Sequence, residues 1–168
     1  MTLDKVNRLD HDLFVTAFGG IYEHSPWVAE RTFPLRPFVS RDDVRAKMRR
    51  VVETASKEDQ LRLVAEHPDL GTRAKVSTAS TDEQAGVGLD RLTPDEFEVI
   101  GRLNRTYRDR FGFPFIYAVK GSNKHHIIQA LASRCENDAE TEFREALEQI
   151  YRIARFRTED LVENGNHV

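Results

Sequence analysis

The sequence has little of what several protein classes require. Cys135 is its only cysteine, so no internal disulfide can form, and no partner stands near it at a spacing typical of zinc ligands. Its 9 glycines and 6 prolines are few for the frequent turns of an all-β chain. These shortages favour a helical protein with a packed or idle thiol.

Long apolar runs and an excess of positive charge are also missing. No stretch approaches the roughly 18 consecutive apolar residues of a membrane span, and residues 1–8 lack the order of a secretory signal. We therefore expect a cytoplasmic protein with no membrane partner. The 25 basic and 28 acidic residues give a net charge of −3, which argues against a nucleic-acid partner. With a mean hydropathy of −0.56, residues 1–168 are expected to form a single compact domain.

Capping residues and apolar spacing predict about seven or eight helices. The strongest signal is Thr93-Pro94-Asp95-Glu96, which places a proline and two acids in the first turn of a helix reaching Phe111. Ser40 and the group 56–59 favour two more capped helices, and the second should end near His67 because Pro68 follows.

Weaker patterns complete an all-α fold. The aromatic stretch 111–119, interrupted by Pro114, is expected to be an extended segment packed among helices. Further helices are predicted from Asp10 with a stripe from Leu13 to Ile21, at 27–33, from a Ser80-x-x-Glu83 capping box, at 125–134, and from Asn137-Asp138 to Leu161.

Polar residues gather at breaks between these helices. The segments are HPDLG at 67–71, STDEQAGVGLD at 80–90 and FGFPFI at 111–116. An imidazole, a carboxylate and an amide beside an aromatic pocket suit proton transfer on a small polar heterocycle. Each residue also has a structural explanation: His67 as a helix-end residue, Glu83 as the capping partner of Ser80, and the phenylalanines as core.

No familiar metal or nucleotide motif is present, and no metal site is expected. His125 and His126 are adjacent, so on a helix they point about 100° apart and cannot bind one metal as an i, i+4 pair would. Near the C-terminus, Arg157 departs from the apolar stripe of the last helix, which can aim it inward. There its guanidinium would suit an anionic substrate.

Five segments in order resemble the family of 2-oxo-4-hydroxy-4-carboxy-5-ureidoimidazoline (OHCU) decarboxylases of urate degradation. They are FGGIYEHSPWVA at 18–29, HPDLG, SxxEQxGxGLD, FGFPFI and IARFR at 153–157. The resemblance implies an all-α carboxy-lyase that converts OHCU to (S)-allantoin without a metal or organic cofactor. It also makes a homodimer the expected assembly.

The resemblance assigns site residues as well. His67 is similar to the family's catalytic histidine and Glu83 to its essential carboxylate. Implied substrate-binding residues are Pro68, Ser80, Gln84, Phe115, Ile116 and Arg157, with Arg155 an alternative to Arg157 as the anchor. Two other functions stay open at this point: a helical binding module that has lost catalysis, and a hydrolase of a ureido compound.

Overall fold

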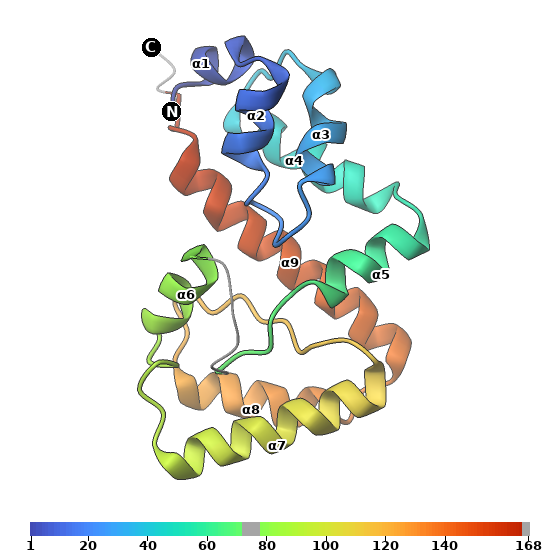
Figure 1. The fold of residues 1–168 in the computed structure, drawn as a ribbon, viewed down its shortest axis with the longest axis vertical. Coiled ribbons are helices and arrows are strands. Elements are labelled where there is room, and N and C mark those ends of the chain that lie inside the picture. The colour runs from blue at the N-terminus through green and yellow to red at the C-terminus, as the bar shows by residue number, and fades with distance from the viewer. Residues whose placement is uncertain (72–77, 166–168) are drawn as a thin grey trace. The chain divides into compact units, whose positions relative to one another are not determined.

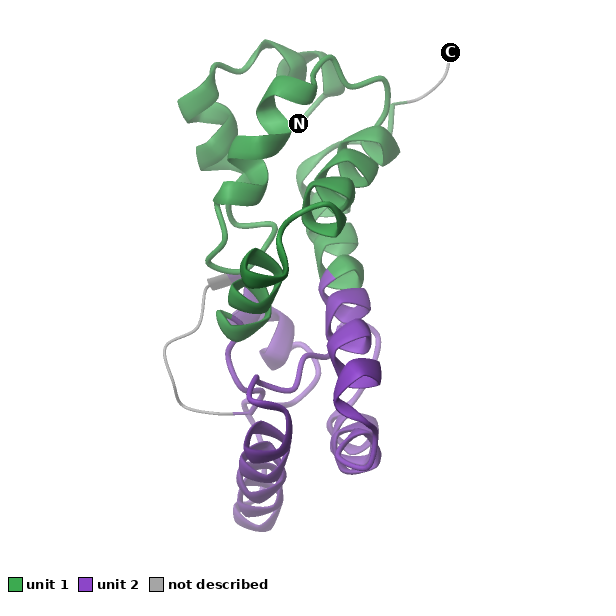
Figure 2. Ribbon diagram, turned by 90° about the vertical axis from the view of Figure 1, so that its right-hand side faces the viewer, with its two compact units in different colours: residues 1–66, 151–168 green, residues 67–150 purple. Residues whose placement is uncertain are grey.

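The computed structural model describes residues 1–71 and 78–165. Within these ranges it contains nine α-helices, one 3-10 helix and no strand, which confirms the all-α prediction. It divides into two compact units, residues 1–66 with 151–168 and residues 67–150 (Figure 2). The expectation of a single domain over 1–168 stays a prediction. No helix of the described residues is long and apolar enough to cross a membrane.

Unit 1 is built from short helices and the end of a long one. They are α1 (Leu3–Arg8), α2 (His11–Phe18), α3 (Trp27–Thr32), η1 (Phe33–Leu35), α4 (Arg41–Glu53), α5 (Lys57–Ala65) and the last part of α9 (Ala139–Leu161) (Figure 1).

Local hydrogen bonds explain where the helices of unit 1 begin. The Ser40 hydroxyl accepts from the backbone N–H of Asp43 at 3.0 Å, and the Ser56 hydroxyl accepts from that of Asp59 at 3.1 Å. Both predicted caps are therefore confirmed. The sequence reading missed α1, which has one buried residue, Val6, and so offers no apolar stripe.

The stripe predicted for α2 was partly wrong. Phe14 and Phe18 are buried and stack at 4.4 Å between ring centroids, as an i, i+4 pair should. Leu13 is 55% exposed because it is turned about 100° from Phe14 around the helix. Ile21 is buried but lies beyond the helix, which ends at Phe18.

Unit 2 contains α6 (Thr78–Ala85), α7 (Pro94–Phe111), α8 (Lys124–Arg134) and the first part of α9. The capping box predicted at Thr93 is present, with reciprocal bonds between Thr93 and Glu96. The capping box predicted for Ser80 and Glu83 was wrong, since α6 begins at Thr78 and contains Ser80. Several small polar residues in a row can each cap a helix, so spacing alone does not locate its start.

An extended segment follows α7, as predicted. Gly112 ends the helix in the left-handed region, with φ of 76°, a conformation that glycine adopts without strain. Residues 113–119 then run without helix or strand, and Phe113, Phe115 and Ile116 are buried. The Phe115 ring meets Tyr107 edge to face at 5.5 Å, which packs the segment against α7.

An ion pair between α7 and α8 gives unit 2 a measurable acid sensitivity. Lys124 donates to Glu96 at 2.7 Å and the Thr93 N–H donates to the same oxygen at 3.0 Å. These bonds, that of Lys124 most of all, lower the pKa of Glu96 from 4.5 to about 2. Because the folded state holds the proton more weakly, this contribution to stability is complete above about pH 4.5 and is lost towards about pH 2.

We predict that Lys124→Met lowers the melting temperature at neutral pH, since it removes the main stabilising partner of the Glu96 carboxylate. The difference from the unmodified chain should shrink as the pH falls from about 4.5 to about 2, where the Glu96 carboxylate of the unmodified chain becomes protonated. Thermal unfolding followed by circular dichroism across this range checks the prediction. A difference that stays constant with pH would contradict it.

Candidate active site

His67 lies where the sequence predicted, at the break after a helix. Helix α5 ends at Ala65, and Pro68 prevents the chain from continuing in helical geometry. The His67 side chain is buried, with 7% of the residue exposed, and Pro68 is half-buried. A buried imidazole is largely shielded from solvent, so its proton partners are neighbouring protein groups or a bound substrate.

The rest of the HPDLG motif is fastened to α7. The buried Asn104 amide donates to the carbonyl of Leu70 at 2.9 Å, and Arg108 pairs with Asp69 at 3.1 Å. The first bond satisfies a carbonyl that no helix would otherwise serve. The chain that follows His67 is therefore fixed by contacts with a long helix of the same unit.

The motif also contacts α6 through its glycine. The backbone N–H of Gly71 donates to Oε1 of Gln84 at 3.1 Å. Gly71 has φ of +67°, and a Cβ there would lie 3.2 Å from the side chains of Ile100 and Leu92, so only glycine fits without strain. With its carbonyl oxygen engaged, Gln84 is oriented so that its amide nitrogen serves as the donor.

Helix α6 places three of the predicted residues together. Ser80, Glu83 and Gln84 stand at i, i+3 and i+4, so they share one face of the helix. Ser80 is buried, while Glu83 and Gln84 are half-buried. Because Ser80 is inside the helix, the N-cap explanation of Glu83 no longer applies.

Phe115 and Ile116 are the remaining predicted site residues of unit 2. Phe115 is fully buried and Ile116 is 2% exposed, so the two form part of the packed interior of the unit. This burial agrees with the explanation of Phe115 as a core residue, and it leaves the role of the two residues at the substrate site a prediction.

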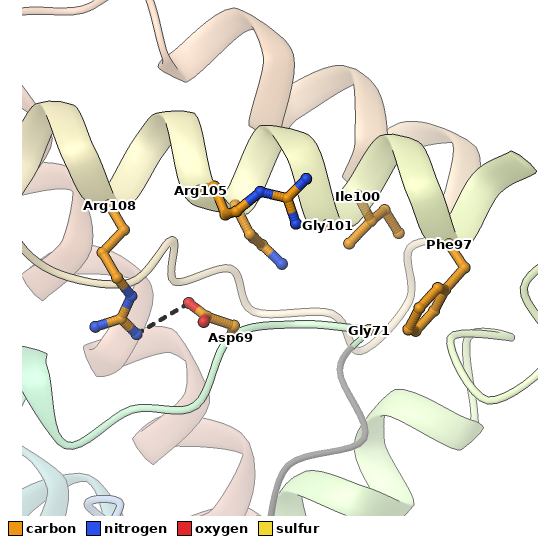
Figure 3. A pocket seen from close by; sticks show the side chains of 8 residues that line it. Asp69, Gly71, Phe97, Ile100, Gly101, Arg105 and Arg108 are labelled. Carbon is orange, nitrogen blue, oxygen red and sulfur yellow. Dashed lines mark hydrogen bonds and ion pairs between the residues drawn. The ribbon is translucent and has the colours of Figure 1, made fainter.

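A cavity of about 280 Å³ lies between residues 69–71 and α7 (Figure 3). In Figure 3 the Asp69 carboxylate faces the guanidinium of Arg108 across one end of it. None of the residues with a predicted catalytic or substrate-binding role lines it. The lining residues are Asp69, Gly71, Phe97, Ile100, Gly101, Asn104, Arg105 and Arg108.

Arg157 belongs to unit 1 and is buried, as its departure from the apolar stripe predicted. Its Nη1 is 2.9 Å from Oε2 of Glu23 and donates to the carbonyl of Gly20 at 3.2 Å. The alternative anchor, Arg155, is exposed and pairs with Glu159 on the surface of the same helix at 2.9 Å. Burial therefore favours Arg157 over Arg155 as a binding residue.

Sequence reasoning missed Glu23, which is fully buried. A signal was present, since Glu23 stands inside FGGIYEHSPWVA, one of the five motif segments. Its partner is 134 residues away, so no local pattern could identify the pair. Among the described residues, no group of three or more histidine, cysteine, aspartate or glutamate side chains could hold a metal ion.

Comparison with known proteins shows to which family the chain belongs. The sequence model of the OHCU decarboxylases matches residues 7–159. The chain belongs to the OHCU decarboxylase family. The family match includes every residue to which the sequence analysis assigned a role, from His67 to Arg157.

Several relatives in this family match over nearly the whole chain. The 2-oxo-4-hydroxy-4-carboxy-5-ureidoimidazoline decarboxylase of Haloferax volcanii is 53% identical, with 94% of each chain covered. The uric acid degradation bifunctional protein of Bacillus subtilis is 48% identical over 96% of this chain, which spans 33% of that protein. A crystal structure of (S)-allantoin synthase has a TM-score of 0.76 and 32% identity, covering 96% of this chain and 54% of the other.

The buried pair in unit 1 yields a stability prediction. Glu23→Leu removes the carboxylate that faces the Arg157 guanidinium, and breaking a buried ion pair by removing one partner costs about 3–5 kcal/mol. We expect a loss of unfolding free energy of about 3 kcal/mol. Urea unfolding followed by circular dichroism measures it.

Glu159→Leu is the matched control, because the same substitution there affects only the surface pair with Arg155 and a longer contact to Arg45. Exposed pairs contribute little, so the control should change the unfolding free energy by less than about 1 kcal/mol. Equal effects of the two variants would show that the Glu23 pair contributes no more than a surface contact.

Proposed function

We propose that the chain decarboxylates OHCU to (S)-allantoin in the degradation of urate. The observation that carries the proposal is the 53% identity to the Haloferax volcanii decarboxylase over 94% of both chains. The relative from Bacillus subtilis is named for uric acid degradation, which supports the same pathway. A carboxy-lyase is accordingly the proposed enzyme class.

The substrate's own chemistry explains how such a protein can work. The carbon that carries the carboxylate also carries a hydroxyl and neighbours a ring imine. When carbon dioxide leaves, the electron pair of the broken carbon–carbon bond forms a double bond to the neighbouring ring carbon, and the electrons of the imine bond move to its nitrogen, which gains a proton. The hydroxyl loses its proton to become a carbonyl, and the neighbouring carbon gains a proton, so one proton in all is taken up from solvent. The protein then has to place the substrate and control these proton transfers.

His67 is proposed as the general base that takes the hydroxyl proton. Its burial and its position between the end of α5 and Pro68 support this role. Glu83 is proposed as the carboxylate that orients the imidazole and favours its protonated form. Delivery of a proton to the neighbouring carbon from one face of the planar intermediate would give the S product.

The remaining residues are proposed to hold the substrate. Gln84, whose oxygen is occupied by the Gly71 N–H, would donate from its amide nitrogen, and Ser80 would add a hydrogen bond. Arg157 would bind an anionic group, with Glu23 fixing its guanidinium. Pro68, Phe115 and Ile116 would form walls. The cytoplasmic location and the homodimer stay predictions.

The first prediction from this proposal is that His67→Asn reduces turnover by about 10²–10⁴-fold, the usual contribution of a general acid or base. OHCU is generated in place from urate by the two upstream enzymes, and allantoin formation is followed by circular dichroism. OHCU decays unaided to racemic allantoin, so a signal of the S product reports enzymatic turnover. His125→Asn, the same change at an exposed histidine of α8, is the matched control and should keep full activity.

A trace from the unmodified protein that matches the spontaneous decay would overturn the proposed function. It would also favour the alternative function, that of a helical binding module that has lost catalysis. Near-normal activity of His67→Asn, with an active unmodified protein, would instead overturn only the role of His67.

The second prediction concerns Glu83. Glu83→Gln should lower turnover by about 10²-fold, because an amide orients the imidazole without favouring its protonated form. Since Glu83 is not a capping residue, the melting temperature should stay within a few degrees of that of the unmodified chain. A loss of turnover matched by a large loss of thermal stability would point to a structural role.

A further inference from the structure

A buried arginine contacts two consecutive residues of the extended segment. Arg134, the last residue of α8, is 9% exposed. Its Nη1 donates to the carbonyl of Ile116 at 2.7 Å, and its Cζ lies 4.5 Å from the centre of the Phe115 ring. One guanidinium therefore fixes the backbone at one residue and the ring of the residue before it.

The guanidinium is itself held by a carboxylate. Nε and Nη2 of Arg134 donate to Oε2 of Glu142 on α9 at 3.0 and 2.9 Å, and Glu142 is fully buried. The Tyr107 hydroxyl on α7 and the Asn137 amide donate to the same carboxylate. Side chains from α7, α8 and α9 thus converge on one ion pair, which leaves Arg134 little freedom to move.

The segment needs such a partner because it is buried without being helical. A buried carbonyl outside a helix has no intrinsic hydrogen-bond partner, and leaving it unpaired is costly. Arg134 serves Ile116, and two residues later the Gln149 side chain accepts from the N–H of Ala118 at 2.9 Å. These side chains set where residues 115–118 lie.

We propose that Arg134 is a positioning residue for the OHCU reaction, acting through Phe115 and Ile116. The inference rests on the proposed function, in which those two residues form a wall of the substrate site. Arg134 is not placed in contact with substrate. It fixes the wall through the Ile116 carbonyl and the Phe115 ring, and displacing a site wall by about 1 Å can cost about 10²-fold in rate.

Two variants separate positioning from general stability. Arg134→Lys keeps a positive charge beside Glu142 but lacks the planar fork, so one ammonium cannot bind the carboxylate, reach the Ile116 carbonyl and cover the Phe115 ring together. Tyr107→Phe is the matched control. It also removes one hydrogen bond to Glu142 and the interaction of the Tyr107 hydroxyl with Arg134. It keeps the ring that packs on Phe115, and it keeps the Ile116 carbonyl, the Phe115 ring and the Glu142 carboxylate with which Arg134 interacts.

Steady-state assays with OHCU are run on both variants. Each variant is assayed the same number of degrees below its own melting temperature. For Arg134→Lys we expect KM to rise at least about fivefold and kcat/KM to fall at least about tenfold. For Tyr107→Phe both constants should stay within about threefold of the unmodified values. A purely structural role would reduce the fraction of folded enzyme, which lowers kcat and leaves KM unchanged.

An unchanged KM in Arg134→Lys, or equal effects in the two variants, overturns the positioning role. An unmodified chain without turnover overturns the proposed function instead, so the two failures are distinguishable. Should Arg134→Lys not fold, Arg134→Met/Glu142→Leu removes both charges together, a change that buried ion pairs often tolerate. An unchanged KM in this double variant would likewise overturn the positioning role of Arg134.

Discussion

Arginines that donate to main-chain carbonyls hold the irregular segments of this helical chain. In unit 1, Arg157 donates to the carbonyls of Gly20 and Ile21. In unit 2, Arg134 donates to that of Ile116. Helices satisfy most of their own carbonyls, but the segments after α2 and α7 contain buried residues outside any helix, such as Ile21 and Ile116, so side chains supply the donors.

Each of these arginines requires a buried acid. Glu23 and Glu142 are fully buried, and each accepts from the guanidinium at 2.9 Å. Replacing a buried ion pair by apolar side chains of similar volume is often neutral or stabilising, so net stability does not explain why a chain would keep two such pairs. Apolar groups would fill the space, but they could not fix the direction of a backbone carbonyl, which a planar fork of donors does.

The separation in sequence between two interacting residues decides whether their interaction could be predicted. The caps at Ser40, Ser56 and Thr93 join residues three apart, so the sequence alone located the starts of α4, α5 and α7. The start of α6 was misplaced because neighbouring polar residues offer equivalent caps, and α1 was missed because a six-residue helix with one buried side chain has no periodicity.

The same contrast between interactions near in sequence and interactions between distant segments applies to the candidate site. The position of His67 at a helix end was predicted from the proline that follows it, whereas the motif resemblance alone assigned roles to His67, Glu83 and Gln84. The hydrogen bond from Gly71 to Gln84 was not predictable, since it depends on how two irregular stretches meet. In the sequence, Glu142 is an acid in the first turn of the last helix, a position typical of exposed residues. Its burial becomes evident only from the structure, in which Arg134 donates to it.

The proposed reaction depends on how firmly the irregular segments are held. When the substrate's own ring accepts the electron pair, catalysis depends on placement and on directing protons to one face. Placement needs rigid walls, yet the segments 67–71 and 113–119 have no regular hydrogen-bond pattern of their own to make them rigid. Asn104 on α7, Gln84 on α6 and Arg134 on α8 supply the missing bonds to Leu70, Gly71 and Ile116. In the proposed reaction the helices would therefore contribute mainly through the polar side chains with which they hold these two irregular segments.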